Sequence, residues 1–522
     1  MDPKENKIVV ESPSSSPPSP NEDLIFQTAH LQANIGSRAA RGGALAISSQ
    51  AAKFVVTIIA TSVMARLLTP NDYGLIGMVA FFTNFVSMFK DLGLSVALIQ
   101  QDKISSAQVS NLFWVNVAFS LATTLLTLLL SPAVAWFYGD RRLIGITALT
   151  AAGFLLGGLA VQHEGLLRRQ MRFGVLATTN LVSMIVGYLV GIAFAIFRFG
   201  YWSLVFSQLA VLGTNTVIVW LACRWRPGLP RRNSGVKSMI VFGRNFTGFS
   251  IVNYFSRNLD NLLIGKFWGA QQLGLYGRAY QLMTLPLDQI NEPITSVAIP
   301  ALSRMTDSAE RYRQAYLRML QKIAILTMPC VVLMIVTADW LVAIVLGPQW
   351  AGTTSIFRLL GIVGIFQPIV NTTGWLFLTQ GRSHDMFKWG LISAPITVGS
   401  IIAGLPWGAL GVATSYSLVQ LCITYPLLFW FVGRKGPVRA GDFYRTVSHI
   451  AFASLAALIV CYALRRLIEI SNPFFGIGFC AVAAIATALL VLLATTSGRD
   501  ALRDVKNTVL LVIRRHEAPF QT

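Results

Sequence analysis

Long apolar stretches recur along this chain, with short polar interruptions, from about residue 44 to residue 496. A helix that crosses a membrane core about 30 Å thick needs roughly 20 consecutive, mostly apolar residues. Backbone groups in hydrocarbon must form their hydrogen bonds within the protein, which restricts a spanning chain to helices or a closed barrel. These stretches lack the alternation of apolar and polar residues that is typical of a barrel strand. The pattern therefore predicts an all-α membrane protein.

Composition supports this fold class. Hydrophobic residues make up 54% of the 522 residues and charged residues only 12%, with a mean hydropathy of +0.60, which excludes a soluble globular protein of this size. Windows of about 19 residues predict about fourteen transmembrane helices. They lie near residues 44–64, 75–97, 112–137, 143–162, 174–197, 201–222, 247–267, 275–300, 319–337, 353–376, 387–404, 408–432, 447–464 and 474–495. The stretches 247–267 and 275–300 are the least apolar, because both contain charged side chains.

The positive charge of the chain indicates how it is oriented. The formal net charge is +20, but the basic residues lie between apolar stretches rather than on one soluble domain, which argues against nucleic acid as a partner. Lysine and arginine concentrate in every second connection, for example at 168–172, 224–244 and 304–322, and in the C-terminal segment. Cytoplasmic connections carry this excess in membrane proteins. The distribution predicts that both termini are cytoplasmic.

The sequence contains an internal repeat. A shift of 200 residues aligns Arg66 with Lys266 and Gly74 with Gly274 within the segments RLLTPNDYGLIG and KFWGAQQLGLYG. Six predicted helices separate the two units, and an even number gives both units the same orientation across the membrane. We therefore expect two six-helix lobes in a parallel, pseudo-twofold arrangement, followed by two further helices.

The remaining segments are polar. A Ser/Pro tract at 11–20 predicts a disordered tail, and no cleaved signal peptide is expected. The predicted organisation is a cytoplasmic N-terminal tail (1–43), an N-terminal six-helix lobe (44–222), a basic cytoplasmic linker (223–246), a C-terminal six-helix lobe (247–432), two appended helices (433–497) and a cytoplasmic C-terminal tail (498–522). The five cysteines are scattered without metal-ligand spacing, so neither a metal nor a cofactor is expected.

Two short motifs carry a family resemblance. An ARxLxPxxYG turn spans Ala65 to Gly74, and a DxGL element spans Asp91 to Leu94. With the overall architecture, they make the chain resemble the Wzx-type polysaccharide exporters of the multidrug/oligosaccharidyl-lipid/polysaccharide flippase superfamily, and within it exporters of the colanic acid or succinoglycan type.

The resemblance implies a non-enzymatic flippase of the bacterial inner membrane. Its substrate would be an undecaprenyl-pyrophosphate-linked oligosaccharide, moved to the periplasmic leaflet for exopolysaccharide or lipopolysaccharide synthesis. Polymerase and chain-length proteins are possible partners. The chain has no GxxxxGK[ST] loop for nucleotide hydrolysis.

Polar and charged side chains within the predicted helices are the candidates for binding such a substrate, because a pyrophosphate needs a cationic, hydrogen-bonding path. The candidate substrate-binding residues are Lys53, Asn253, Tyr254, Arg257, Asn258, Asn261, Tyr280, Gln281 and Arg358. The candidates for ion coupling or gating are Asp91, Asp260, Asp288 and Glu292. Two other interpretations remain open: a charge-neutralising Arg257–Asp260 pair, and polar packing between helices.

Two other functions are compatible with many transmembrane helices. A drug exporter of the same superfamily would share the architecture, but its often cationic substrates fit poorly with Lys53 and Arg257 in the interior. A membrane polysaccharide polymerase or ligase resembles proteins with a large periplasmic loop, and every predicted external connection here is short. The sequence therefore favours the flippase.

Overall fold

A computed structural model describes the backbone of residues 35–91, 104–230, 237–470 and 472–517. Within these ranges the side chains of 35–48, 89–91, 237–253 and 508–517 lie outside the description. Most of the predicted N-terminal tail (1–43) therefore lies outside the described residues. Of the predicted linker (223–246), residues 231–236 and the side chains of 237–246 lie outside them.

Every regular element in the described residues is helical, which confirms the predicted fold class. Nine helices in the described ranges are long and apolar enough to cross a membrane, and a bent helix pair adds a tenth if it is one span. The count of about fourteen stays a prediction, because α4 and α10 are not among these nine.

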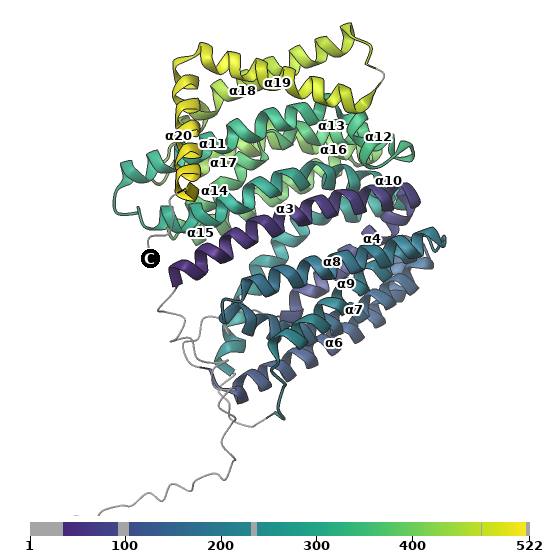
Figure 1. The fold of residues 1–522 in the computed structure, drawn as a ribbon. Helices are drawn as coiled ribbons and strands as arrows, with labels where there is room; N and C mark the ends of the chain where they lie inside the picture. Colours follow the sequence, from purple (N-terminus) through teal and green to yellow (C-terminus); the bar gives the residue numbers. More distant parts are fainter. Residues whose placement is uncertain (1–34, 92–103, 231–236, 471, 518–522) are drawn as a thin grey trace, which may run out of the picture.

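The first helices pack into one group (Figure 1). Within it α6 packs on α7, α8 on α9, and α7 on α9, while α3 contacts α8. α6 and α7 approach each other closely because Gly158 of α7 faces the small Ser120 of α6. A Cβ added at Gly158 would lie 2.0 Å from the Ser120 hydroxyl oxygen. The members are α3 (Ile35–Leu67), α4 (Pro70–Asp91), α6 (Ser106–Tyr138), α7 (Arg142–Arg169), α8 (Phe173–Ile196) and α9 (Trp202–Cys223).

A second group follows in green in Figure 1. It consists of α11 (Ala309–Val336), α12 (Ala338–Val345), η1 (Pro348–Trp350), α13 (Thr353–Gly364), α14 (Gln367–Thr379), α15 (Ser383–Gly404), η2 (Leu405–Trp407), α16 (Gly408–Val419), η3 (Gln420–Thr424) and α17 (Tyr425–Gly433). The chain bends by 42° between α13 and α14, next to Pro368, which has no N–H to continue the helical hydrogen bonds.

The long element α10 (Lys237–Ser303) connects the two groups. It contains two helical parts, 237–268 and 270–303, that meet at Gly269, whose φ of 78° and ψ of 179° break the helix. These parts contain the two least apolar predicted stretches. α10 packs on α4 of the first group and on α13, α15 and α16 of the second.

Three helices complete the chain. α18 (Ala440–Leu467) and α19 (Pro473–Ala494) pack on each other and on α11. Asp442, near the start of α18, accepts hydrogen bonds from Arg313 of α11 at 2.9 and 2.5 Å. α20 (Thr496–Glu517) runs across the direction of α18 and α19 (Figure 1), and Lys322 forms an ion pair of 3.0 Å with its Asp504. Most of the predicted C-terminal tail is therefore helical.

Candidate functional site

The first part of α10 carries Tyr254, Arg257, Asn258 and Asn261 at helical spacing, here named the polar face of α10, and Tyr254 joins this face to α4. The Tyr254 hydroxyl donates a 2.6 Å hydrogen bond to the Phe81 carbonyl oxygen of α4, and the Tyr254 ring lies 5.7 Å from the Phe81 ring. The Asn258 amide donates to the Tyr254 carbonyl oxygen at 2.9 Å. Two of the predicted substrate-binding residues therefore lie together, close to the first helix group.

Asp260 is held by hydrogen bonds rather than by a cation. Its carboxylate accepts a 2.8 Å bond from the Tyr276 hydroxyl, in the second part of α10, and a 2.8 Å bond from the backbone N–H of Asn261. The bond to Tyr276 joins the two parts of α10 on either side of the break at Gly269. No ion pair between Asp260 and Arg257 occurs among the described residues.

Arg257 lies on the same helix and remains exposed. Its positive charge acts on the Tyr280 and Tyr416 hydroxyls. Tyr280 is 37% exposed, whereas Tyr416 is partly buried. None of the ion pairs within the described ranges includes Arg257. Arg257 is therefore an exposed cation outside these ion pairs, and its charge acts on phenols from two different helices, α10 and α16.

The second part of α10 meets α3 through its acidic residues. Glu292 accepts a 3.2 Å hydrogen bond from the Gln50 amide of α3, and its charge acts on the neighbouring Asp288. Lys53 lies three residues beyond Gln50, which places it near the helix face that meets α10. Both carboxylates are exposed, and Lys53 is partly buried.

Other predicted site residues lie elsewhere or cannot be placed. The side chains of Asp91 and Asn253 are outside the described residues. Arg358 of α13 forms a 3.0 Å ion pair with Asp339 of α12 rather than with a residue of α10. Asn261 is partly buried on α10.

The ARxLxPxxYG motif holds one end of the helix bundle together. The Ala65 carbonyl oxygen accepts hydrogen bonds from the Gln349 amide at 2.6 Å and the Trp350 indole N–H at 2.8 Å. The Arg66 guanidinium donates a 2.9 Å bond to the Ile344 carbonyl oxygen. The end of α3 is therefore bonded to α12 and η1 of the second helix group.

Arg278 belongs to the same end and was not among the predicted site residues, although it lies within the predicted stretch 275–300. Its guanidinium lies over the Tyr73 ring at 3.6 Å and also hydrogen bonds the Gln281 side chain. Tyr73 in turn packs edge-on against Trp350 with ring centroids 5.4 Å apart. Gln281, a predicted substrate contact, is thus engaged with this network. The only sign of this network in the sequence was the tyrosine of the motif, Tyr73. No spacing rule pairs Tyr73 with Arg278, so the contact could not be predicted.

Two glycines bring α4 and the second part of α10 into direct backbone contact, here named the glycine contact. A Cβ added at Gly74 would lie 1.7 Å from the Ala270 carbonyl oxygen, and one added at Gly274 would lie 1.9 Å from the Pro70 carbonyl oxygen. Gly74 meets residue 270 and Gly274 meets residue 70, so the two contacts are equivalent under the repeat shift of 200 residues. Only glycine fits at either crossing position.

Comparison with known proteins identifies the family. Residues 63–355, more than half of the chain, match the family described as "Polysaccharide biosynthesis protein". The chain belongs to this family. The match begins just before the ARxLxPxxYG motif and extends beyond both parts of α10, so it includes the glycine contact and the polar face. The resemblance to Wzx-type exporters is thereby confirmed.

Individual relatives extend the similarity over most of the chain. The teichuronic acid biosynthesis protein TuaB of Bacillus subtilis is 28% identical over 416 residues, 78% of this chain and 85% of TuaB. The succinoglycan biosynthesis transport protein ExoT of Rhizobium meliloti is 24% identical over 477 residues, 90% of this chain and 91% of ExoT. The inward closed conformation of the lipid II flippase MurJ aligns with a TM-score of 0.69 at 13% identity, covering 87% of this chain and 98% of MurJ. The last of these shows a shared fold.

Proposed function

We propose that this protein flips undecaprenyl-pyrophosphate-linked oligosaccharide repeat units from the cytoplasmic to the periplasmic leaflet of a bacterial inner membrane, for exopolysaccharide or lipopolysaccharide synthesis. The observation that carries the proposal is Arg257, an exposed guanidinium outside the ion pairs of the described residues, on a polar helix that contacts both helix groups. Family membership and relatives named for polysaccharide biosynthesis and transport support it.

The chemistry of the polar face suits this substrate. An anionic pyrophosphate crosses hydrocarbon only if the protein replaces the water around its charge. A guanidinium offers two parallel N–H donors to phosphate oxygens, and Lys53 adds a point charge from α3. Tyr254, Tyr280, Asn258 and Asn261 supply hydroxyl and amide groups for the sugars.

Alternating access provides the mechanism that we propose. The glycine contact and the hydrogen bonds of the ARxLxPxxYG motif close one end of the bundle. This end is the periplasmic one if the termini are cytoplasmic. The substrate enters from the opposite end, and separation of α4 from α10 releases it. Asp260, Asp288 and Glu292, and Asp91 at the end of α4, are the groups that we propose for ion coupling, since a carboxylate in a membrane interior gains stability by binding a proton or cation.

The proposed orientation predicts which connections react with an external reagent. In a variant whose five cysteines are replaced by serine, Arg141→Cys between α6 and α7 should react with a membrane-impermeant maleimide on intact spheroplasts. Asp307→Cys, between α10 and α11, should react only after permeabilisation. Both positions are exposed, so access to the reagent differs only through the membrane. The opposite labelling pattern would reverse the proposed orientation.

Transport is tested most directly in proteoliposomes. A lipid-linked oligosaccharide with a fluorescent sugar, incorporated into both leaflets, is exposed to an external reagent that destroys the fluorophore. Vesicles with the protein should lose most of the signal, whereas protein-free vesicles should lose only the outer-leaflet half. A lipid-linked sugar with a neutral linker should stay protected, because it lacks the charge that Arg257 binds. Equal loss in vesicles with and without the protein would reject the proposal.

A further inference from the structure

The helices around the end of α18 form a pocket separate from the polar face of α10. Its volume is about 690 Å³. Three arginines contribute to its wall, Arg358 from α13 and Arg465 and Arg466 from α18, together with Tyr462. The other lining side chains are apolar: Ile335, Val336, Leu458, Ile459 and Ala463. We name it the arginine pocket.

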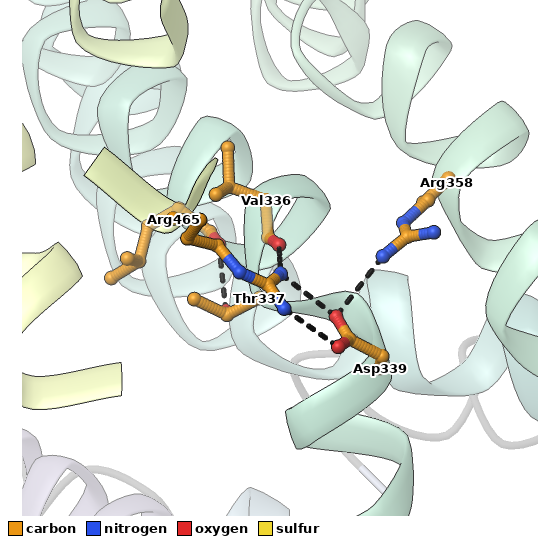
Figure 2. Close-up of polar contacts among 6 residues, drawn as sticks. Val336, Thr337, Asp339, Arg358 and Arg465 are labelled. Carbon is orange, nitrogen blue, oxygen red and sulfur yellow. Dashed lines mark hydrogen bonds and ion pairs between the residues drawn. The ribbon is translucent and has the colours of Figure 1, made fainter. Parts of the chain in front are cut away.

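The polar part of the arginine pocket is built around one carboxylate (Figure 2). Asp339 accepts two hydrogen bonds from Arg465, at 2.9 and 2.7 Å, and forms a 3.0 Å ion pair with Arg358 from the other side. Arg465 also donates to the Val336 carbonyl oxygen and lies 3.9 Å above the Trp340 ring, which fixes its orientation. Arg465 is therefore a rigid part of the wall, while Arg358, whose side chain is 46% exposed, retains free donors.

The charges do not balance. Partial burial raises the pKa of Asp339, but the hydrogen bonds and charge of Arg465 outweigh it and hold this pKa below its ordinary value. The pocket thus contains three guanidinium groups and one ionised carboxylate beside it, which pairs with Arg358 and Arg465. Arg466 has the Tyr462 hydroxyl as its neighbour, at 3.0 Å, rather than an acidic group. The pocket carries an excess of two positive charges, which fits a bound anion.

The surface next to the pocket indicates that the anion belongs to a lipid. Exposed apolar side chains on α18 recur every three or four residues, at Phe452, Leu455, Ile459 and Tyr462. This spacing gives a continuous stripe along one face of a membrane-length helix, and the stripe runs into the pocket at Ile459 and Tyr462. Arginines at a helix end beside an apolar helix face match the headgroup and the acyl chain of a phospholipid.

We propose that the arginine pocket binds the phosphate of an anionic membrane phospholipid, with an acyl chain along the α18 stripe. Arg358 and Arg466 hold the phosphate, and Arg465, fixed by Asp339, positions the site. The bound lipid is a resident one, distinct from the transported lipid-linked sugar, because the pocket shares no residue with the polar face of α10. It would attach α18 to α13 of the second helix group.

Native mass spectrometry of the full-length protein in detergent provides the test, with phosphatidylglycerol as the probe and phosphatidylcholine as the neutral comparison. The variant Arg358→Gln/Arg466→Gln keeps the Asp339–Arg465 pair, and Arg141→Gln/Arg198→Gln removes two exposed arginines elsewhere. We expect the first variant to bind phosphatidylglycerol at least tenfold more weakly than the wild type, and the control to match the wild type. Equal binding by both variants, or equal binding of both lipids to the wild type, would overturn the proposal.

Two further arms identify the source of the phosphate. Inorganic phosphate in millimolar excess should not displace phosphatidylglycerol; if it does, the pocket is a site for soluble anions and the proposal fails. Phosphatidylglycerol should also raise the thermal unfolding midpoint of the wild type and of the control, but not that of Arg358→Gln/Arg466→Gln. An equal rise for all three proteins would also reject the site. These measurements involve no transport, so they are independent of the proposed flipping.

Discussion

A single methyl group at position 274 should reduce transport at least tenfold. In Gly274→Ala the new Cβ would lie 1.9 Å from the Pro70 carbonyl oxygen, well inside the 3.0 Å below which real contacts essentially never fall. The conflicting atoms belong to two backbones, so no side-chain rotation relieves the overlap, and α4 must move away from α10. Overpacking of this kind costs on the order of 1–3 kcal/mol, and about 1.4 kcal/mol shifts a two-state equilibrium tenfold. The closed end would then form too rarely to complete the transport cycle.

The chain supplies matched controls for this substitution. Gly277 lies one helical turn further along the same helix, and a Cβ added there meets nothing within 4 Å, so Gly277→Ala should transport at the wild-type rate. Gly74→Ala should reproduce the defect from the other side, because its Cβ would lie 1.7 Å from the Ala270 carbonyl oxygen. Rates are compared in proteoliposomes at equal amounts of folded protein, measured by size-exclusion chromatography. A Gly274→Ala protein with the wild-type rate would remove the glycine contact from the mechanism.

Hydropathy was sufficient to locate helices that face lipid. The predicted stretch 112–137 lies within α6 and the stretch 474–495 nearly coincides with α19, because the membrane imposes the same length and apolar character on any crossing helix. The stretches 247–267 and 275–300 were weakly apolar, yet both lie in helical parts of α10. The alternation of basic connections supported them, because leaving out either stretch would break that alternation.

Contacts between distant helices could not be predicted in the same way. The repeat aligned Gly74 with Gly274, but only the structure shows that each packs against the other's helix, since spacing does not reveal how two helices cross. Arg358 was assigned to the substrate path because it is charged and lies within a predicted helix. Its partner Asp339, and Arg465 of α18, are distant in sequence, and no local pattern connects them. Arg465 and Arg466 lie between the predicted stretches 447–464 and 474–495 and were not among the candidate site residues.

Removal of the Arg257 guanidinium should lower the flipping rate by roughly ten- to a hundredfold, because hydrogen bonds to charged groups contribute about 1.5–3 kcal/mol each. Arg257 stands outside the ion pairs of the described residues, so Arg257→Ala leaves no carboxylate without its partner, and Asp260 keeps its bonds to Tyr276 and Asn261. The loss should therefore reflect substrate binding rather than folding.

Two comparisons separate charge from geometry at this position. Arg257→Lys keeps the positive charge but not the paired N–H donors, and should fall between the wild type and Arg257→Ala. Arg304→Ala removes an exposed cation just beyond the end of α10 and should leave the rate unchanged. The measurement is the proteoliposome rate at several concentrations of lipid-linked oligosaccharide, where a binding defect raises the half-saturating concentration. Full activity in Arg257→Ala would remove the observation on which the proposed function rests. Lys53 would then be the remaining candidate cation for substrate binding.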